Sequence, residues 1–168
     1  GIAYVSEDRK NQGVLLKMSI RWNITLPILR ELSKMTFINF KEENKCVDKY
    51  KDALRIKTPS INQLVGNLSG GNQQKVAVAK WLASESKILI LDEPTRGIDV
   101  GAKQEIYELI NRPTDEGLAI IMISSEMEEI MGMSDRMLVM AEGRIVGELD
   151  REEFSQNQIM KYASNITD

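Results

Sequence analysis

Residues 88–94 read ILILDEP, four apolar residues followed at once by Asp92, Glu93 and Pro94. A continuous apolar run of this length is typical of a strand that is buried in a parallel sheet. Because α/β proteins place their ligands at the carboxyl ends of such strands, the two carboxylates are predicted to lie at a site. One carboxylate there can hold Mg²⁺ through water, and the next can orient or deprotonate an attacking water. The alternative is a strand end that is capped by solvated acids.

Strands and helices alternate along the rest of the sequence. Apolar runs at residues 2–5 and 118–124 predict two further strands, the polar stretch 6–13 predicts a loop, and residues 137–147 predict a β-hairpin. Helices are predicted over residues 18–50, 72–82, 100–111, 126–131 and 151–163, with Arg112-Pro113 ending the third of these.

This alternation indicates an α/β fold with a parallel sheet. The mostly helical stretch in the first half of the chain is predicted to be an insertion into that sheet. We therefore expect residues 1–8 and 85–168 to form a core subdomain and residues 9–84 to form a helical subdomain.

Composition excludes several classes of protein. The chain has 168 residues, 42% of them hydrophobic and 28% charged, with 22 Lys and Arg against 25 Asp and Glu. Without histidine it can hold neither a Ser-His-Asp triad nor a His-ligated metal, and Cys46 alone cannot form an internal disulfide. The sequence lacks the strongly basic stripe that nucleic-acid-binding proteins usually show. Its apolar runs are too short to cross a bilayer. These features predict a protein of the cytosolic type.

A second pattern of interest lies at residues 67–74, NLSGGNQQ. Ser69 is followed by Gly70 and Gly71 at the predicted start of a helix, so several backbone N–H groups and a hydroxyl are exposed there. Together with the helix dipole they form an anion site suited to phosphate. The alternative for this segment alone is a simple helix N-cap followed by a turn.

The two patterns together are more specific than either alone. Leu-Ser-Gly-Gly, one helix, an apolar strand and Asp-Glu-Pro-Thr, in this order, resemble the ABC ATPase family over essentially the whole chain. The resemblance puts the signature loop at residues 68–71, the Walker B strand at 88–93 and the D-loop at 97–99. The chain looks more narrowly like the second of the two tandem ATP-binding domains of monosaccharide importers, in the segments SEDRK (6–10), GGNQQK (70–75), TRGIDVGAK (95–103) and SSEM (124–127).

The resemblance implies a cofactor, ATP with Mg²⁺, and roles for particular residues. ABC domains pair head to tail, so Ser69, Gly70 and Gly71 are expected to contact the γ-phosphate of ATP held by a partner domain. Asp92, as the metal residue, and Glu93, as the catalytic carboxylate, are expected to serve the nucleotide of their own domain. The other residues expected at the nucleotide are Gln73, Glu7 and Asp99.

Three departures from the family pattern bear on activity. The Walker A loop, G-x-x-x-x-G-K-[ST], occurs nowhere in these residues. Glu7 stands where the family has the Q-loop glutamine, and Ser125 stands where it has the switch histidine, so we assign Ser125 to the catalytic site as a replacement. A hydroxyl cannot carry the positive charge of an imidazole. We therefore expect ATP hydrolysis at this domain's own site to be poor, although Glu93 is kept.

The chain begins at Gly1 without a methionine and runs straight into an apolar segment, so we expect a cut inside a longer protein; an engineered or processed start is the alternative. Such a fragment is expected to be inactive alone and to self-associate. The resemblance implies as partners a second ATP-binding domain, permease subunits in the membrane and, indirectly, an extracytoplasmic sugar-binding protein. It places the chain peripherally on the cytoplasmic face of the bacterial cell membrane. For Trp22, core packing and a contact with the permease are both open.

Two other functions stay open. One is a soluble ABC ATPase that does not act in transport, for which a basic surface or long coiled-coil heptads would be expected. The other is a regulatory ABC domain without catalysis, which Ser125 and the missing loop favour. ATPase assays that compare the parent protein with Glu93→Gln would separate such a domain from an enzyme.

Overall fold

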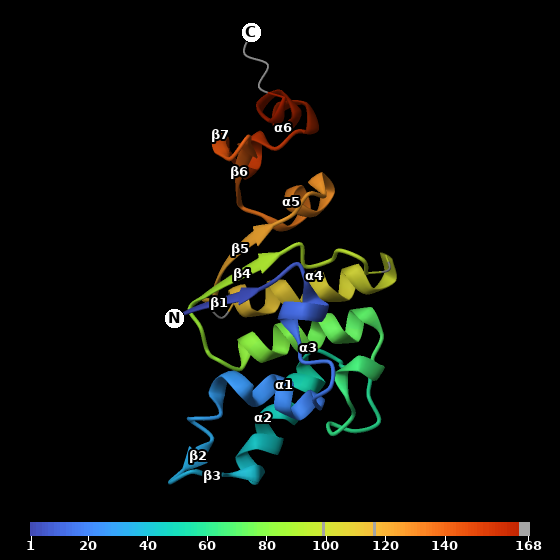
Figure 1. Cartoon of the computed structure of the whole chain (residues 1–168). Coiled ribbons are helices and arrows are strands. Elements are labelled where there is room, and N and C mark those ends of the chain that lie inside the picture. The colour runs from blue at the N-terminus through green and yellow to red at the C-terminus, as the bar shows by residue number, and fades with distance from the viewer. Residues whose placement is uncertain (99, 116, 165–168) are drawn as a thin grey trace. The chain divides into compact units, whose positions relative to one another are not determined.

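A parallel sheet organises the first part of the chain in the computed structural model, which describes residues 1–98, 100–115 and 117–164. The chain divides into two units, Gly1–Ile121 and Met122–Asp168 (Figure 1). The sheet has the strand order β1 (Ile2–Val5), β4 (Ile88–Asp92) and β5 (Ala119–Ile123), so all three predicted strands are confirmed. β1 and β4 are parallel, with Ile2 opposite Ile88 and Val5 opposite Leu91.

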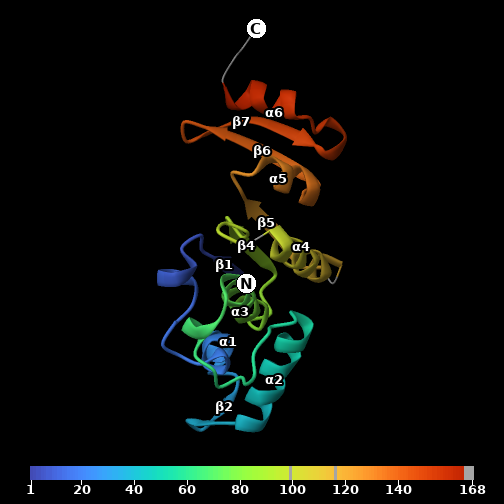
Figure 2. The ribbon, with the colours of Figure 1, turned by 90° about the vertical axis from the view of Figure 1, so that its right-hand side faces the viewer.

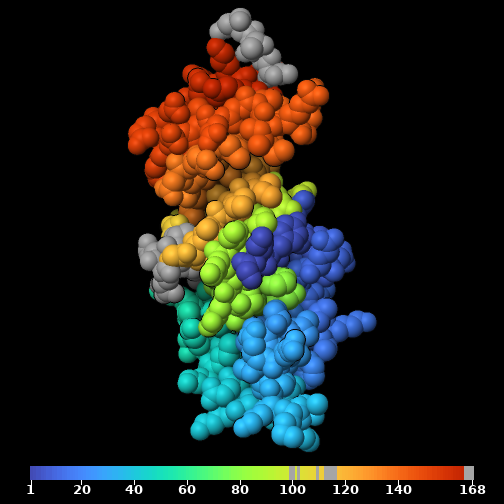
Figure 3. Space-filling model, turned by 90° about the vertical axis from the view of Figure 1, so that its left-hand side faces the viewer, coloured from blue at the N-terminus to red at the C-terminus, as the bar shows by residue number. Residues whose placement is uncertain are grey.

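The two faces of β1 differ strongly in burial. Ala3 and Val5 are 1% exposed, whereas Ile2 and Tyr4 are 68% and 45% exposed. Figure 3 shows the first residues of the chain, in dark blue, open at the surface of this unit. The buried face packs on helix α3 (Gly70–Leu82), which therefore holds the glycine-rich loop at its N-terminus in a fixed relation to the sheet.

The helical pattern predicted over residues 18–50 is confirmed only in part, because a hairpin interrupts it. The structure has instead α1 (Ile20–Thr25), a 3₁₀ turn η2 (Leu26–Ile28), a short hairpin and α2 (Phe40–Ala53). The hairpin strands are β2 (Ser33–Lys34) and β3 (Phe37–Ile38), which pair antiparallel. Pro27, which has no backbone N–H, lies at the start of η2, and Met35 and Thr36 have φ of 49° and 74°, outside helical backbone geometry.

Two smaller expectations are also corrected. The polar segment after β1 contains a helical turn, η1 (Arg9–Gly13), which forms because the carboxylate of Asp8 accepts a hydrogen bond from the backbone N–H of Asn11 at 3.1 Å. The helix after β4 does not end at Pro113; α4 continues from Val100 to Asp115. A proline removes a single backbone hydrogen bond, and only a short run of helix follows it here.

Helix α3 has neighbours on two sides. α3 packs against α1 and α2 on one side and beside α4 on another, as Figure 1 shows. A 3₁₀ turn, η3 (Val65–Asn67), leads into the start of α3. Among the described residues no helix is long and apolar enough to cross a membrane.

The second unit is built on the predicted β-hairpin, which is confirmed. Its strands are β6 (Arg136–Ala141) and β7 (Arg144–Asp150), and Glu142 and Gly143 form the turn with φ of 49° and 75°. Helix α5 (Met127–Met133) comes before the hairpin. The terminal helical stretch is divided into η4 (Arg151–Glu153) and α6 (Gln156–Ala163), which lies along the hairpin (Figure 2).

The core of this unit consists of Met137, Val139, Leu149 and Ile159. A Cβ on Gly147 would lie 2.5 Å from Cγ of Tyr162, so glycine is required where the ring of α6 meets β7. The expected division of the chain into residues 9–84 and the two flanking core segments stays a prediction.

Candidate functional site

The carboxylate at the end of β4 is held by the neighbouring strand. The hydroxyl of Tyr4 in β1 donates a hydrogen bond of 2.6 Å to Oδ2 of Asp92, and this bond raises the pKa of the Tyr4 phenol. The sequence analysis missed Tyr4. The feature that could have indicated it is the parallel pairing of β1 with β4, which places Tyr4 opposite Ile90, two residues before Asp92. Glu93 follows with φ of 46°, so the chain turns sharply at the second carboxylate.

The loop before α3 is fixed by side chains of its own helix. Gln73 is 6% exposed, and its amide nitrogen lies 3.2 Å from the backbone oxygens of both Val65 and Leu68. Nδ2 of Asn72 donates to Oγ of Ser69 at 2.9 Å, and this hydroxyl does not cap the helix. The first N–H groups of a helix have no acceptor within the helix, so the N-terminus of α3 presents donors that an anion can accept.

Arg9 contacts this loop and was missed by the sequence analysis. A Cβ on Gly70 would lie 3.3 Å from Nη2 of Arg9 and 3.9 Å from the backbone oxygen of Gly97. Nε of Arg9 is buried and has no hydrogen-bond partner among the described residues, and burial lowers the pKa of this guanidinium. Three segments thus meet at one place: the turn after β1, the loop before α3 and the loop after β4.

A second link joins the same segments nearer the surface. The carboxylate of Glu7 forms an ion pair with Arg96, and the two side chains are 43% and 64% exposed. The backbone N–H of Arg96 also donates to the oxygen of Glu93 at 3.1 Å. The sequence analysis named Arg96 only as part of a motif. The ion pair indicates a role for Arg96, which is to neutralise the charge of Glu7 at the edge of the site.

The remaining predicted site residues are less closely grouped. Gly71 is the second residue of α3, beside Gly70. Asp99 lies outside the described residues. Ser125 belongs to the second unit, where it stands between β5 and α5, and the neighbouring Oγ of Ser124 accepts a hydrogen bond of 3.0 Å from the N–H of Glu126.

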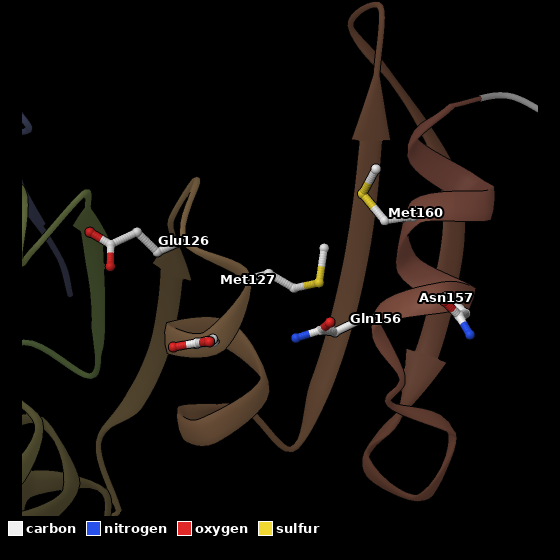
Figure 4. Close-up of a pocket in the computed structure, with 6 residues that line it drawn as sticks. Glu126, Met127, Gln156, Asn157 and Met160 are labelled. Carbon is white, nitrogen blue, oxygen red and sulfur yellow. The ribbon is translucent and has the colours of Figure 1, made fainter.

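The second unit has an open groove between α5 and α6, of about 520 Å³. Figure 4 shows the thioethers of Met127 and Met160 near one another, with Glu126 at one end. Its other lining residues are Glu128, Gln156 and Asn157. None of the site residues predicted from the sequence lines this groove.

The residues of the first unit fit Mg²⁺ and a nucleotide phosphate in different ways. Mg²⁺ keeps several waters and is usually held by one or two carboxylates together with substrate phosphates. The hydrogen bond from Tyr4 occupies one oxygen of Asp92, so the other can accept from a hydrated cation. At the loop before α3, donors from the helix end and the guanidinium of Arg9 both favour an anion. Among the described residues no cluster of three metal ligands occurs.

A comparison with known protein families identifies the family of this chain. Residues 1–96, more than half of the chain, match the family described as ABC transporter. The chain belongs to the ABC transporter family. Membership implies ATP binding, and the match includes β1, α3 and the Asp92-Glu93 pair.

Relatives of the ABC chain include sugar-import proteins. It is 57% identical, over 97% of its length, to the ribose import ATP-binding protein RbsA of Clostridium tetani (strain Massachusetts / E88). It is 58% identical, over 98% of its length, to the xylose import ATP-binding protein XylG of Thermoanaerobacter pseudethanolicus (strain ATCC 33223 / 39E). The chain spans 32% of the length of each of these two relatives.

Solved structures of ABC proteins share the fold. The ATP-binding cassette MJ0796, in a dimeric post-hydrolysis state bound to ADP and Pi, matches with a TM-score of 0.77 and 20% identity, over 91% of this chain and 64% of that one. The cbiO1 protein of Clostridium perfringens, part of the ABC transporter complex cbiONQ, matches with a TM-score of 0.76 and 28% identity, over 95% and 61%. The chain thus has a large part of the α/β ABC nucleotide-binding fold, and the predicted fold class is confirmed.

Proposed function

We propose that this chain belongs to the ATP-binding subunit of an ABC importer for a monosaccharide, within the second of two tandem ATP-binding domains. The observation that carries the proposal is the identity of 57% and 58%, over nearly the whole chain, to ribose and xylose import ATP-binding proteins. Because these residues cover only 32% of those relatives, ATP hydrolysis and transport are assigned to the complete subunit.

The carboxylates at the end of β4 supply the chemistry at the domain's own nucleotide. Asp92 would hold Mg²⁺ through water, with Tyr4 fixing the orientation of its carboxylate by the 2.6 Å hydrogen bond. Glu93 would orient or deprotonate the attacking water. Bound Mg²⁺ would neutralise charge on the phosphates; the residues of this chain hold and orient the groups around it.

The loop before α3 serves the nucleotide of the other domain. Ser69, Gly70 and Gly71 would donate to the γ-phosphate there, since a helix N-terminus favours negative charge. Gln73 keeps the loop in place through the oxygens of Val65 and Leu68, and its own contact with nucleotide stays a prediction. The predicted nucleotide contacts of Glu7 and Asp99 belong to the same proposal.

An exposed apolar surface fits the permease as a partner. Ser19 forms a bridge with Leu64, which brings the start of α1 beside the segment that precedes η3. The exposed apolar side chains of these segments, each 38–46% exposed, are Leu15, Met18, Trp22, Leu26 and Leu64. Such a surface is typical of a contact with a protein partner, and the 42% exposure of Trp22 supports the permease contact over core packing. The subunit would then lie peripherally on the cytoplasmic face of the bacterial membrane, with the sugar-binding protein acting through the permease.

The second candidate is a regulatory domain that binds nucleotide without hydrolysing it, and Ser125 favours it. A serine at this position cannot donate from two ring nitrogens or carry their charge. In that case Glu93 would be dispensable for transport. A soluble ABC ATPase that works outside transport has no comparable observation in its favour.

The test uses the polypeptide that carries this chain, assembled with its permease in proteoliposomes. Glu93→Gln is expected to lower ATP-dependent sugar uptake and ATP turnover together, with Glu108→Gln, an exposed acid on α4, as the matched control. Unchanged uptake in Glu93→Gln would support the regulatory candidate. If the assembled wild type takes up no ribose, no xylose and no other monosaccharide, the transport assignment itself is contradicted.

A further inference from the structure

Three strongly exposed large apolar side chains of the first unit lie on its short hairpin and at the start of the helix that follows it. Met35, Phe37 and Phe40 are 86%, 80% and 60% exposed. Figures 1 and 2 both show β2 and β3 at the end of this unit that is remote from its sheet. The guanidinium of Arg21 lies 5.8 Å from the centre of the Phe40 ring, whereas Met35 and Phe37 are almost fully exposed. A cluster of exposed apolar groups of this kind marks a surface that binds a membrane or another molecule.

The backbone of the turn holds these side chains outward. Lys34 pairs with Phe37 across the hairpin, so Met35 and Thr36 are the two turn residues, with φ of 49° and 74°. Left-handed backbone at both turn positions is normally supplied by glycine or asparagine, because other side chains are strained there. The exposure of Met35 is therefore a consequence of a fixed turn.

The charges beside the apolar residues are mostly positive. Between positions 30 and 42 the sequence has three cations, Arg30, Lys34 and Lys41, and two exposed acids, Glu31 and Glu42, which gives this segment a net positive charge although the whole chain has a net charge of −3. All three cations are exposed, and none forms an ion pair with another described residue. We call Met35, Phe37 and Phe40, with Arg30, Lys34 and Lys41, the hairpin tip.

We propose that the hairpin tip docks directly on the surface of an anionic lipid bilayer. Apolar and aromatic side chains can enter the headgroup region, while each neighbouring cation is attracted by anionic headgroups. The positive charge is what favours a lipid surface over a second, net negative copy of this chain. The contact goes beyond the proposed function, because it needs neither ATP nor the permease.

Sedimentation with lipid vesicles tests the contact on the 168-residue chain. Vesicles of phosphatidylcholine with 30% phosphatidylglycerol are compared with vesicles of phosphatidylcholine alone, at low and high salt. We expect binding to the anionic vesicles that falls with salt. Lys34→Glu/Lys41→Glu should lose at least about 30-fold in binding, since each cation near such a surface contributes about 1 kcal/mol. Met35→Ser/Phe37→Ser should lose binding at least as strongly.

Controls separate the hairpin tip from apolar exposure in general. Met140→Ser/Ile145→Ser removes two side chains that are 65% and 61% exposed on the other hairpin, and should bind as the wild type does. Circular dichroism checks that each variant is folded, because both tryptophans lie in the first unit whereas Met140 and Ile145 lie in the second. Equal binding to both lipids, equal loss in the control pair, binding only to vesicles that contain the permease, or self-association that the Met35→Ser/Phe37→Ser variant abolishes would each overturn the proposal.

Discussion

Removing the buried or the exposed partner of one ion pair should destabilise the first unit by clearly different amounts. Nζ of Lys75 in α3 lies 2.6 Å from Oε2 of Glu105 in α4 and 3.3 Å from the backbone oxygen of Arg55. The side chain of Lys75 is 3% exposed and that of Glu105 is 40% exposed. The pair joins the helix that carries the signature loop to the helix that follows β4.

The difference in exposure sets the magnitudes. In Lys75→Met the carboxylate of Glu105 can turn to water. We therefore expect the free energy of unfolding to fall by only about 1 kcal/mol, which is the value of a charged hydrogen bond reduced for screening by solvent. In Glu105→Ala the ammonium of Lys75 stays buried with one carbonyl as partner. Breaking a buried pair in this way costs about 3 kcal/mol. Helix propensity does not oppose this ordering, because alanine is the best helix former.

Urea unfolding followed by tryptophan fluorescence measures both values. Trp22 and Trp81 both lie in the first unit, so the signal reports that unit. Glu108→Ala, at an exposed position of α4, is the control and should change stability little. A loss in Lys75→Met equal to or larger than that in Glu105→Ala would refute the reasoning, because the cost would then not come from an unpaired buried charge.

The same pair predicts a pH dependence of known sign. The hydrogen bond and charge of Lys75 lower the pKa of Glu105 from its ordinary 4.5. A lowered pKa in the folded state means that the stabilisation is fully present above 4.5 and is lost as the pH falls through the folded value. The stability difference between wild type and Lys75→Met should therefore be constant at pH 5.5–7 and shrink below about 4.5.

Three further predictions concern the site and the open sheet. Gly70→Asp, in the complete subunit, should abolish sugar uptake while leaving the fold intact, because it puts bulk and negative charge where phosphate must approach; normal uptake would make the loop a simple helix cap. Ser125→His should raise ATP turnover if the domain's own site is otherwise competent, since an imidazole could donate to the γ-phosphate; unchanged turnover would point to a site that is idle for other reasons. The 168-residue chain should self-associate in light scattering, because Ile2 and Ile121 are 68% and 52% exposed on the sheet, and a monomer that is insensitive to dilution would contradict this.

The sequence predicted the elements that carry strong local patterns. The structure has β4 within residues 88–94 and the start of α3 at residues 69–71, as predicted. It also has the β6–β7 hairpin around residues 137–147. These patterns need only neighbouring residues: alternation or continuity of apolar side chains, and glycine at a turn or a helix start. The helical prediction for residues 18–50 missed the hairpin because the turn residues, Met35 and Thr36, are neither glycine nor asparagine, the residues that usually indicate such a turn.

The contacts within the site could not be predicted in the same way. Tyr4 reaches Asp92 across 88 positions of sequence, and Arg9 reaches Gly70 across 61. Local patterns give the elements, whereas such pairs depend on strand register and on how helices pack on the sheet. The resemblance assigned roles only to the motif residues, so Tyr4 and Arg9 received none, and the roles that it did assign stay predictions.

The contact of Arg9 with the signature loop changes how the glycine there should be understood. The resemblance explains Gly70 by the approach of a phosphate, but any larger residue would also have to push aside the half-buried guanidinium at 3.3 Å and would face the oxygen of Gly97 at 3.9 Å. The distance of 3.9 Å is an ordinary contact, whereas the guanidinium would have to move by a few tenths of an ångström, so the start of α3 is in close contact mainly with Arg9. Arg9 has no anionic partner among the described residues, so an anion at the loop would be attracted to it as well. If the loop before α3 binds an anion, as proposed, the anion would then act through Arg9 on the turn after β1, which begins beside Glu7, by a contact within one chain.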